Sequence, residues 1–271
     1  MSAGENALEA AFQVENADGD ARILLICDHA SNALPAAYGS LGLPASELQR
    51  HIAHDIGALS VARRVAQRLD APLVSAQFSR LLIDPNRGLD DPTLVMKLSD
   101  GAIIPANRKI DRFNNHEEWQ ARIDRFYLPY HKAISDALAR AQQADIAPLI
   151  VSIHSFTPHW RGQARPWPIA VLWDKDERFA AHMRDYMRRL PAQPLGDNEP
   201  YSGRLKNDTL YRHGTQNGLA HGLVELRQDK IDTVDGQAFW AGHVAAMIEQ
   251  ALADPAIGEI CCLGSHTDAK V

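Results

Sequence analysis

The feature that most constrains the fold of this chain is the alternation of short apolar runs with longer amphipathic stretches. Short apolar runs bounded by polar loops are typical of buried strands, and their alternation with helices favours a mainly parallel sheet. We therefore predict an α/β three-layer sandwich with a mainly parallel or mixed sheet and helices on both faces. The expected strands are residues 22–27, 72–78, 148–153, 168–173 and 219–226, with a further short strand at 81–83. The expected helices are residues 58–69, 117–143, 177–190 and 237–252.

Two of the expected helices carry clear signals. Within residues 58–69, Ala58, Val61 and Val65 recur at helical spacing and define one apolar face. In the next helix, Pro129 is expected to kink or divide the helical stretch, because proline removes a backbone hydrogen bond and clashes with the preceding turn.

Composition limits the class of protein. The chain has 271 residues, of which 45% are hydrophobic and 23% charged, which is typical of a globular protein with a substantial core. We expect a single domain over residues 1–271, with a polar, acidic lead-in at 1–20 and a loose tail at 254–271. The net charge of −6 argues against a nucleic-acid partner, because phosphate binding favours a basic face.

The sequence also lacks the signals of export and of membrane insertion. No apolar run approaches the roughly 20 residues of a membrane-spanning helix. The first 20 residues hold five acidic residues and no Lys or Arg, which is the opposite of a signal peptide. The three cysteines, Cys27, Cys261 and Cys262, form no CxxC pair and suggest no disulfide framework. We expect a cytoplasmic protein without a membrane partner, and the sequence does not define its oligomeric state.

Four residues that can bind a metal or move a proton lie near the ends of expected strands. His29 follows the first strand, Asp55 precedes the next helix, His154 follows the strand at 148–153, and Glu225 lies late in the last strand. Open α/β sheets place their sites at the carboxyl ends of strands. Two imidazoles and one carboxylate can hold one catalytic zinc ion, with a further carboxylate as general base. This pattern predicts His29, Asp55 and His154 as ligands and Glu225 as the base.

Each of these residues also has a purely structural interpretation. A histidine at a strand end is often a hydrogen-bonded surface residue, and His51 and His54 are rival ligands beside Asp55. Asp55 could instead be the N-cap of the following helix. Glu225 could simply pair with Arg227 or a neighbouring arginine, because a buried carboxylate needs a partner.

Two further residues allow competing interpretations. Cys27 could be a soft metal ligand beside His29, although a small hydrophobic position in the core is its more usual role. Ser155 beside His154 would suit a serine hydrolase, but no GxSxG motif surrounds it.

A second group of polar residues follows the strand at 72–78. Arginine recognises carboxylates with a planar, bidentate fork, so several arginines near a metal would suit a small anionic substrate. The alternative is pairing with nearby aspartates on a solvated surface, where an ion pair contributes only about 0–1 kcal/mol. The predicted substrate-binding residues are Arg80, Asn86, Arg87 and Arg227, and the alternative partners are Asp84, Asp90, Asp91 and Asp229.

Taken in order, five motifs resemble those of the N-formylglutamate amidohydrolase family. They are ICDHASN (26–32), HDIG (54–57), SRL (79–81) with DPNR (84–87), SIHSFTP (152–158) and VELR (224–227). The resemblance covers roughly residues 22–252. The family is similar in plan to zinc-dependent exopeptidases and to zinc N-acetylmuramoyl-L-alanine amidases. Carried over position by position, the resemblance again implies His29, Asp55 and His154 as zinc ligands and Glu225 as the catalytic residue.

The resemblance implies a zinc-dependent amidohydrolase that cleaves a linear amide of an N-formyl or N-acyl amino acid, such as N-formyl-L-glutamate to L-glutamate and formate. Glu225 would take a proton from water and pass it to the leaving amine, while Arg80, Arg87 or Arg227 would hold the substrate carboxylates. Two alternatives remain open: a peptide or cell-wall amidase of the same fold, and a non-catalytic protein that binds a small molecule.

Overall fold

A seven-stranded mixed sheet forms the centre of the computed structural model, which describes residues 10–190 and 193–268. The strands are β1 (Phe12–Glu15), β2 (Ile23–Cys27), β3 (Leu73–Ala76), β6 (Leu149–Phe156), β9 (Ile169–Leu172), β10 (Leu195–Asp197) and β11 (His221–Arg227). Their order is β1-β3-β2-β6-β11-β9-β10. The four adjacent strands β3, β2, β6 and β11 are parallel, whereas β1 and β9 run antiparallel to their inner neighbours.

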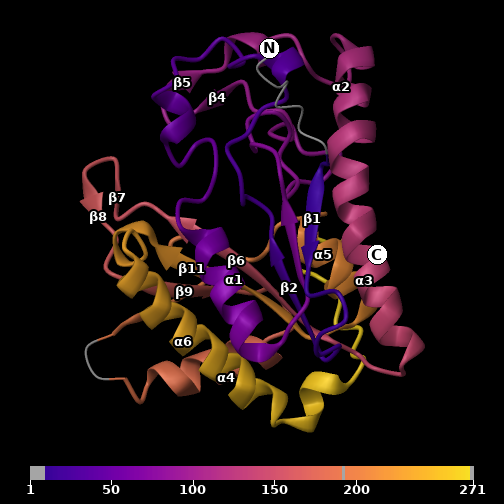
Figure 1. Ribbon diagram of the computed structural model, residues 1–271, viewed down its shortest axis with the longest axis vertical. Coiled ribbons are helices and arrows are strands. Elements are labelled where there is room, and N and C mark those ends of the chain that lie inside the picture. The colour runs from indigo at the N-terminus through magenta and orange to yellow at the C-terminus, as the bar shows by residue number, and fades with distance from the viewer. Residues whose placement is uncertain (1–9, 191–192, 269–271) are drawn as a thin grey trace, which may run out of the picture.

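Helices cover both faces of this sheet, which confirms the predicted fold class. The helices are α1 (Ala58–Leu69), α2 (His116–Arg122), α3 (Leu128–Gln143), α4 (Arg178–Met187), α5 (Thr209–His213) and α6 (Val234–Leu252). Helices α1, α4 and α6 pack on one face, and α3 lies on the other (Figure 1). Two short hairpins lie outside the sheet, one of β4 (Leu98–Ser99) and β5 (Ala102–Ile103) and one of β7 (His159–Trp160) and β8 (Gln163–Ala164).

The central strands are buried on both sides, as is typical of a parallel sheet covered by two helical layers. In β2, Leu25 and Cys27 join the core beneath α1 and α6, whereas Leu24 and Ile26 join the core beneath α3. This alternation follows from the two-residue repeat of a strand. Cys27 is fully buried, so the prediction of a core position for this residue is confirmed.

The helix predicted at residues 58–69 has the predicted bounds, and Val61 and Val65 are fully buried on its inner face. Its N-cap is Gly57 rather than Asp55, so the capping interpretation of Asp55 is wrong. Gly57 has a φ of 81°, and a Cβ atom there would lie 2.8 Å from the carbonyl oxygen of Ile231. Both facts favour glycine, and this tight turn leaves the Asp55 carboxylate free to point elsewhere.

The helical stretch predicted at residues 117–143 is divided, as expected from Pro129. Helix α2 passes into a π-helical segment, Ile123–Tyr127, and α3 begins at Leu128 with the proline in its first turn. The backbone N–H of Leu128 donates to the carbonyl oxygen of Ile123, so the chain stays helical through the π-helical segment, and Pro129, which has no N–H to donate, follows directly after it.

Three predictions about the extent of regular structure are wrong. Strand β6 continues through Phe156 rather than ending at residue 153, because β11 pairs with it as far as Arg227. Residues 81–83 form a fully buried turn instead of a strand, and the side chains of Asn107 and Arg122 donate to the carbonyl groups of Leu81 and Leu82. The predicted lead-in contains β1, which pairs with β3 at the edge of the sheet; residues 1–9 lie outside the described part.

The tail predicted as loose is anchored at several points. Ile257 and Ser265 are buried. The backbone N–H of His266 donates to Asp174, and the hydroxyl of Tyr211 donates to Asp268. Residues 269–271 lie outside the described part. Within the described residues, no helix combines the length and apolar character that crossing a membrane would need.

Candidate active site

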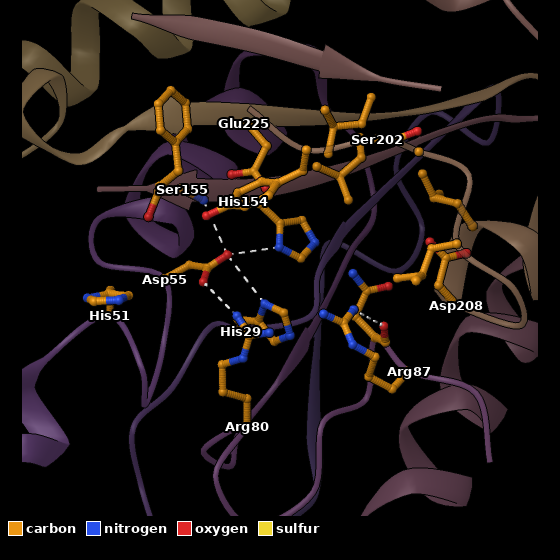
Figure 2. Close-up of a pocket in the computed structure, with 18 of the residues that line it drawn as sticks. His29, His51, Asp55, Arg80, Arg87, His154, Ser155, Ser202, Asp208 and Glu225 are labelled. Atoms are coloured by element: carbon orange, nitrogen blue, oxygen red, sulfur yellow. Dashed lines mark hydrogen bonds and ion pairs between the residues drawn. The ribbon is translucent and has the colours of Figure 1, made fainter. Parts of the chain in front are cut away.

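Four of the predicted site residues converge at the carboxyl ends of the parallel strands. His29 lies two residues beyond the end of β2, His154 lies near the carboxyl end of β6, and Glu225 lies in β11. Asp55 lies in the loop before α1 and reaches the same point (Figure 2). All four side chains are buried, with exposed fractions between 2% and 7%. The sheet therefore brings together residues as far apart in the chain as His29 and Glu225.

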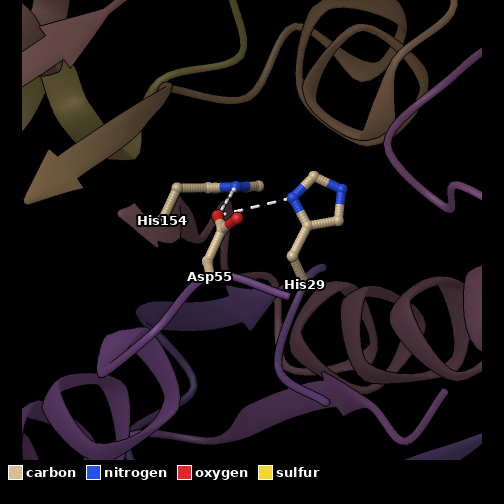
Figure 3. Close-up of side chains that lie close together, drawn as sticks. All are labelled: His29, Asp55 and His154. Carbon is tan, nitrogen blue, oxygen red and sulfur yellow. Dashed lines mark hydrogen bonds and ion pairs between the residues drawn. The ribbon is translucent and has the colours of Figure 1, made fainter. Parts of the chain in front are cut away.

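His29, Asp55 and His154 form a group that could hold a metal ion. Each offers one ligand atom, and these atoms all lie within 4.8 Å of one another. Oδ2 of Asp55 lies 2.8 Å from Nδ1 of His154 and 3.4 Å from Nδ1 of His29 (Figure 3). Tetrahedral ligands that each lie about 2 Å from zinc are roughly 3.3 Å apart, so the donor types and their spacing fit such an ion. We call these three residues the candidate metal centre.

Two buried carboxylates orient the histidines of this centre. Nε2 of His29 lies 2.7 Å from Oδ1 of Asp84, and Nε2 of His154 lies 3.0 Å from Oδ2 of Asp28. An Nε2–H that donates to a carboxylate leaves the lone pair of Nδ1 free to face a metal. This arrangement is the usual outer support of a histidine ligand.

Sequence reasoning did not assign a role to these two carboxylates. Asp28 directly precedes His29, but its partner His154 is 126 positions away. Asp84 was considered only as an ion-pair partner of the arginines. The only local sign of a role for Asp84 is the polar loop in which it lies. Its contact with a distant histidine depends on the folded sheet and cannot be inferred from neighbouring residues.

The carboxylates make this point favourable for positive charge. Burial by itself would raise the pKa of Asp28 and Asp55, but the hydrogen bonds and charges of the two histidines outweigh it and lower both values. For His154, burial opposes the charged form, yet hydrogen bonds with Asp28 and Asp55 raise its pKa to about 10. A cation is therefore stabilised where the three donor atoms meet.

Glu225 is a buried carboxyl beside this centre. Its Oε2 atom has no hydrogen-bond partner among residues 10–190 and 193–268. Burial, assisted by the charge of Asp55, raises the pKa of Glu225 to about 7, although the neighbouring His154 acts in the opposite direction. A carboxyl with this pKa can both accept and donate a proton near neutral pH.

The predicted substrate-binding residues separate into two groups. Arg80, Asn86 and Arg87 line the cavity at the candidate metal centre. Arg80 donates through Nε and Nη2 to Asp84, while its Nη1 lies 3.6 Å from Oδ1 of Asp55. Nη1 of Arg87 donates to the carbonyl oxygen of Asn86.

Arg227 is placed apart from these three residues. Its side chain donates to Asp229 and to the carbonyl oxygen of Arg165, and it is absent from the lining of the cavity in the described part of the chain. The alternative interpretation, pairing with a neighbouring aspartate, describes its position. The alternative pairing of Glu225 with Arg227 is not seen in the described part of the chain, where Arg227 pairs with Asp229.

The rival ligands do not join the candidate metal centre. His51 lines the cavity, but its Nε2 faces Asp100 at 3.5 Å. Nδ1 of His54 is buried without a hydrogen-bond partner in the part of the chain that is described. Ser155 donates through its hydroxyl to the carbonyl oxygen of Ile56, which leaves it unlike an activated serine nucleophile.

The class of protein that this fold and site define is a hydrolase with a candidate metal centre at the carboxyl ends of its parallel strands. The family is shown by comparison: a model described as N-formylglutamate amidohydrolase matches residues 21–231. The chain therefore belongs to the N-formylglutamate amidohydrolase family and is a hydrolase that acts on amide bonds.

Two solved structures are similar over almost their whole length. A gene product of Agrobacterium tumefaciens has 35% sequence identity and a TM-score of 0.85, with 92% of this chain and 97% of that chain covered. The N-formylglutamate amidohydrolase of Ralstonia eutropha has 22% identity and a TM-score of 0.69, with 91% of this chain and 99% of that chain covered; at this identity the likeness concerns the fold. A comparison with curated protein sequences gives no match.

Proposed function

We propose that this protein is a zinc-dependent amidohydrolase that cleaves the linear amide of an acidic N-formyl or N-acyl amino acid. The reference reaction is the hydrolysis of N-formyl-L-glutamate to L-glutamate and formate. The observation that carries the proposal is the convergence of His29, Asp55 and His154 with the carboxyl of Glu225, whose Oε2 atom has no hydrogen-bond partner among the described residues. Membership of the family supports the same reaction type.

His29 and His154 through Nδ1 and Asp55 through Oδ2 would hold one zinc ion. When bound, zinc supplies a Lewis acid that polarises the acyl oxygen and acidifies a water molecule. Asp28 and Asp84 keep the Nδ1 atoms of the histidines directed at the shared point through their contacts with Nε2. This support fixes the orientation of both rings before substrate arrives.

Glu225 is the proposed general base and then the general acid. Its carboxylate takes a proton from the attacking water, and the resulting carboxyl passes that proton to the nitrogen of the leaving amine. Burial raises the pKa of Glu225 above that of an ordinary carboxyl, which favours the protonated form that the second transfer needs. Among the described residues, no hydrogen bond to Oε2 of Glu225 has to be broken before this atom can accept a proton.

Arg80, Asn86 and Arg87 are proposed to hold the carboxylates of the substrate. A guanidinium recognises a carboxylate through two parallel N–H groups. Arg80 is held by two hydrogen bonds to Asp84, whereas Arg87 donates through Nη1 to the carbonyl oxygen of Asn86 and has its Nε 3.9 Å from Oδ2 of Asp91, so a substrate carboxylate would displace a weaker ion pair at Arg87. Because Arg227 donates to Asp229, it is not among the proposed contacts with the substrate carboxylates.

The test is a substrate panel assayed with zinc-restored protein. We expect kcat/KM for N-formyl-L-glutamate or another acidic N-acyl amino acid to exceed that for muropeptides and for neutral N-acyl amino acids. Preferred hydrolysis of muropeptides would favour the cell-wall amidase alternative. Binding of acidic N-acyl amino acids without turnover would favour the non-catalytic alternative and contradict the proposal.

A further inference from the structure

The cavity at the candidate metal centre continues from the cationic side chains into an aromatic region. Its volume is about 400 Å³, and its lining includes Phe156, Trp160 and Tyr201, which we call the aromatic wall. Trp160 and Tyr201 are 37% and 45% exposed, so a large part of each side chain faces solvent. A formyl group contains a single carbon atom and would leave this wall in contact with water.

The aromatic wall is held together by one buried cation. Arg165 is 8% exposed, and its guanidinium carbon lies 5.6 Å from the ring centres of Phe156 and Trp160 and 5.0 Å from that of Tyr201. Nη1 of Arg165 also donates to the carbonyl and hydroxyl oxygens of Thr157. Cation–π contacts of a desolvated guanidinium are favourable, so Arg165 orders rings that come from β6, from β7 and from the loop before α5.

The cationic side chains and the segment that holds Tyr201 and Ser202 lie on opposite sides of the candidate metal centre. Figure 2 shows Arg80 and Arg87 on one side of the centre, and Glu225 and Ser202 on the other. Tyr201 directly precedes Ser202. Burial, together with the charge of Glu225, raises the pKa of Tyr201, which is consistent with a ring close to that carboxyl. An amide bond at the centre would therefore have an anion-binding region at one end and an apolar region at the other.

We propose that the substrates are N-acyl amino acids with a bulky, apolar acyl group, and that an aromatic acyl group is preferred over formyl. The carboxylates of the amino acid would face Arg80 and Arg87, and the acyl group would lie against the aromatic wall. Hydrolysis would add the hydroxyl of water to the acyl carbon and a proton to the amine nitrogen, giving a carboxylate and a free amino acid. The proposal rests on the amidohydrolase function proposed above and adds the class of acyl group.

The experiment compares N-benzoyl-L-glutamate with N-formyl-L-glutamate on zinc-loaded protein. For the wild type we expect kcat/KM to be about tenfold or more higher with the benzoyl substrate, because one apolar group in a matching pocket contributes discrimination of this size. Trp160→Ala should lower kcat/KM for the benzoyl substrate about tenfold and change the formyl value less than about twofold. Tyr201→Ala should act in the same way from a separate loop, which guards against a folding defect in either variant. Phe113→Ala, at a ring that is 80% exposed elsewhere on the surface, is the matched control and should change neither value.

The outcomes separate the two proposals. Hydrolysis of the formyl substrate at least as fast as the benzoyl substrate would overturn the acyl preference and leave the amidohydrolase function standing. An equal loss with both substrates in both wall variants would also overturn it. Hydrolysis of neither substrate would contradict the proposed function itself. Faster hydrolysis of γ-L-glutamyl-anilide than of N-benzoyl-L-glutamate would overturn the proposed orientation, because the carboxylate would then belong to the acyl side.

Discussion

Glu225 lies directly opposite His154 in the parallel pairing of β11 with β6. Paired residues on neighbouring strands point to the same face of the sheet, so this register places a carboxyl beside a candidate metal ligand without any loop between them. A shift of one residue in the register would turn Glu225 to the other face. The candidate general base is therefore positioned by the pairing of two central strands.

This relationship gives the first prediction. Glu225→Gln keeps the size of the side chain and removes its ability to accept a proton, so zinc should be retained while kcat falls by about 10²- to 10⁴-fold. Zinc content and steady-state kinetics of the variant measure both effects. An unchanged kcat would show that another group acts as the base.

The outer carboxylates give the second prediction. Asp84→Asn and Asp28→Asn remove the charged acceptors of Nε2 of His29 and His154, and we expect each variant to bind zinc about 10- to 100-fold more weakly. Competition with a metal chelator of known affinity measures the change. Asp229→Asn removes an exposed carboxylate that contacts Arg227 and serves as a control. Equal zinc affinity in all three variants would mean that the outer carboxylates do not support the ligands.

The separation of the arginines gives the third prediction. Arg87→Ala should raise KM for acidic N-acyl amino acids about tenfold or more, because a charge-assisted contact contributes about 1.5–3 kcal/mol, and should affect neutral analogues much less. Arg227→Ala removes a cation that lies outside the cavity lining of the described residues and should leave KM nearly unchanged. A larger effect at Arg227 than at Arg87 would restore the assignment made from sequence alone.

A buried pair of histidines, one in α3 and one in α5, gives the fourth prediction. Nε2 of His131 donates to the carbonyl oxygen of Pro85, so its Nδ1 accepts from Nε2 of His213 at 2.9 Å. Burial lowers the pKa of His131 to about 3 and that of His213 to about 4. Both residues are therefore neutral in the folded state at a pH where the unfolded chain already binds protons.

The sign of the pH effect follows from these values. The stabilisation is complete above the unfolded pKa of about 6.5, and it is lost as pH falls from there towards 4. His213→Gln keeps an N–H donor but removes one titrating group. The free energy of unfolding of the variant should therefore fall less steeply with decreasing pH than that of the wild type, and the two slopes should differ by up to about 1.4 kcal/mol per pH unit. Denaturant unfolding between pH 7 and pH 4.5 measures the two slopes, and parallel curves would contradict the prediction.

Sequence patterns were sufficient for much of the fold and for the convergence of the site. The helical face of Val61 and Val65 and the apolar run before His29 are local signals, and the rule that sites lie at strand ends brings His29 and His154 together. The arrangement of the arginines was less accessible, because Arg80 and Arg227 have aspartates at similar sequence distances and only the fold shows which of the two faces the cavity.

The errors have a common physical cause, which is long-range pairing. The end of β6 depends on the length of β11, and the strand in the lead-in depends on an open edge beside β3. The anchoring of the tail depends on Asp174 and Tyr211, which lie 92 and 57 positions from their partners. No local pattern of apolar residues contains such information.

The central claim is that one zinc ion at His29, Asp55 and His154 is required for amide hydrolysis. The most direct measurement is the metal content of the purified protein, together with hydrolysis of acidic N-acyl amino acids before chelation, after chelation and after zinc is restored. We predict about one zinc ion per chain, loss of activity on chelation, recovery with zinc, and loss of both metal and activity in His29→Ala and His154→Ala. Full activity of the chelated protein, or of both histidine variants, would contradict the account.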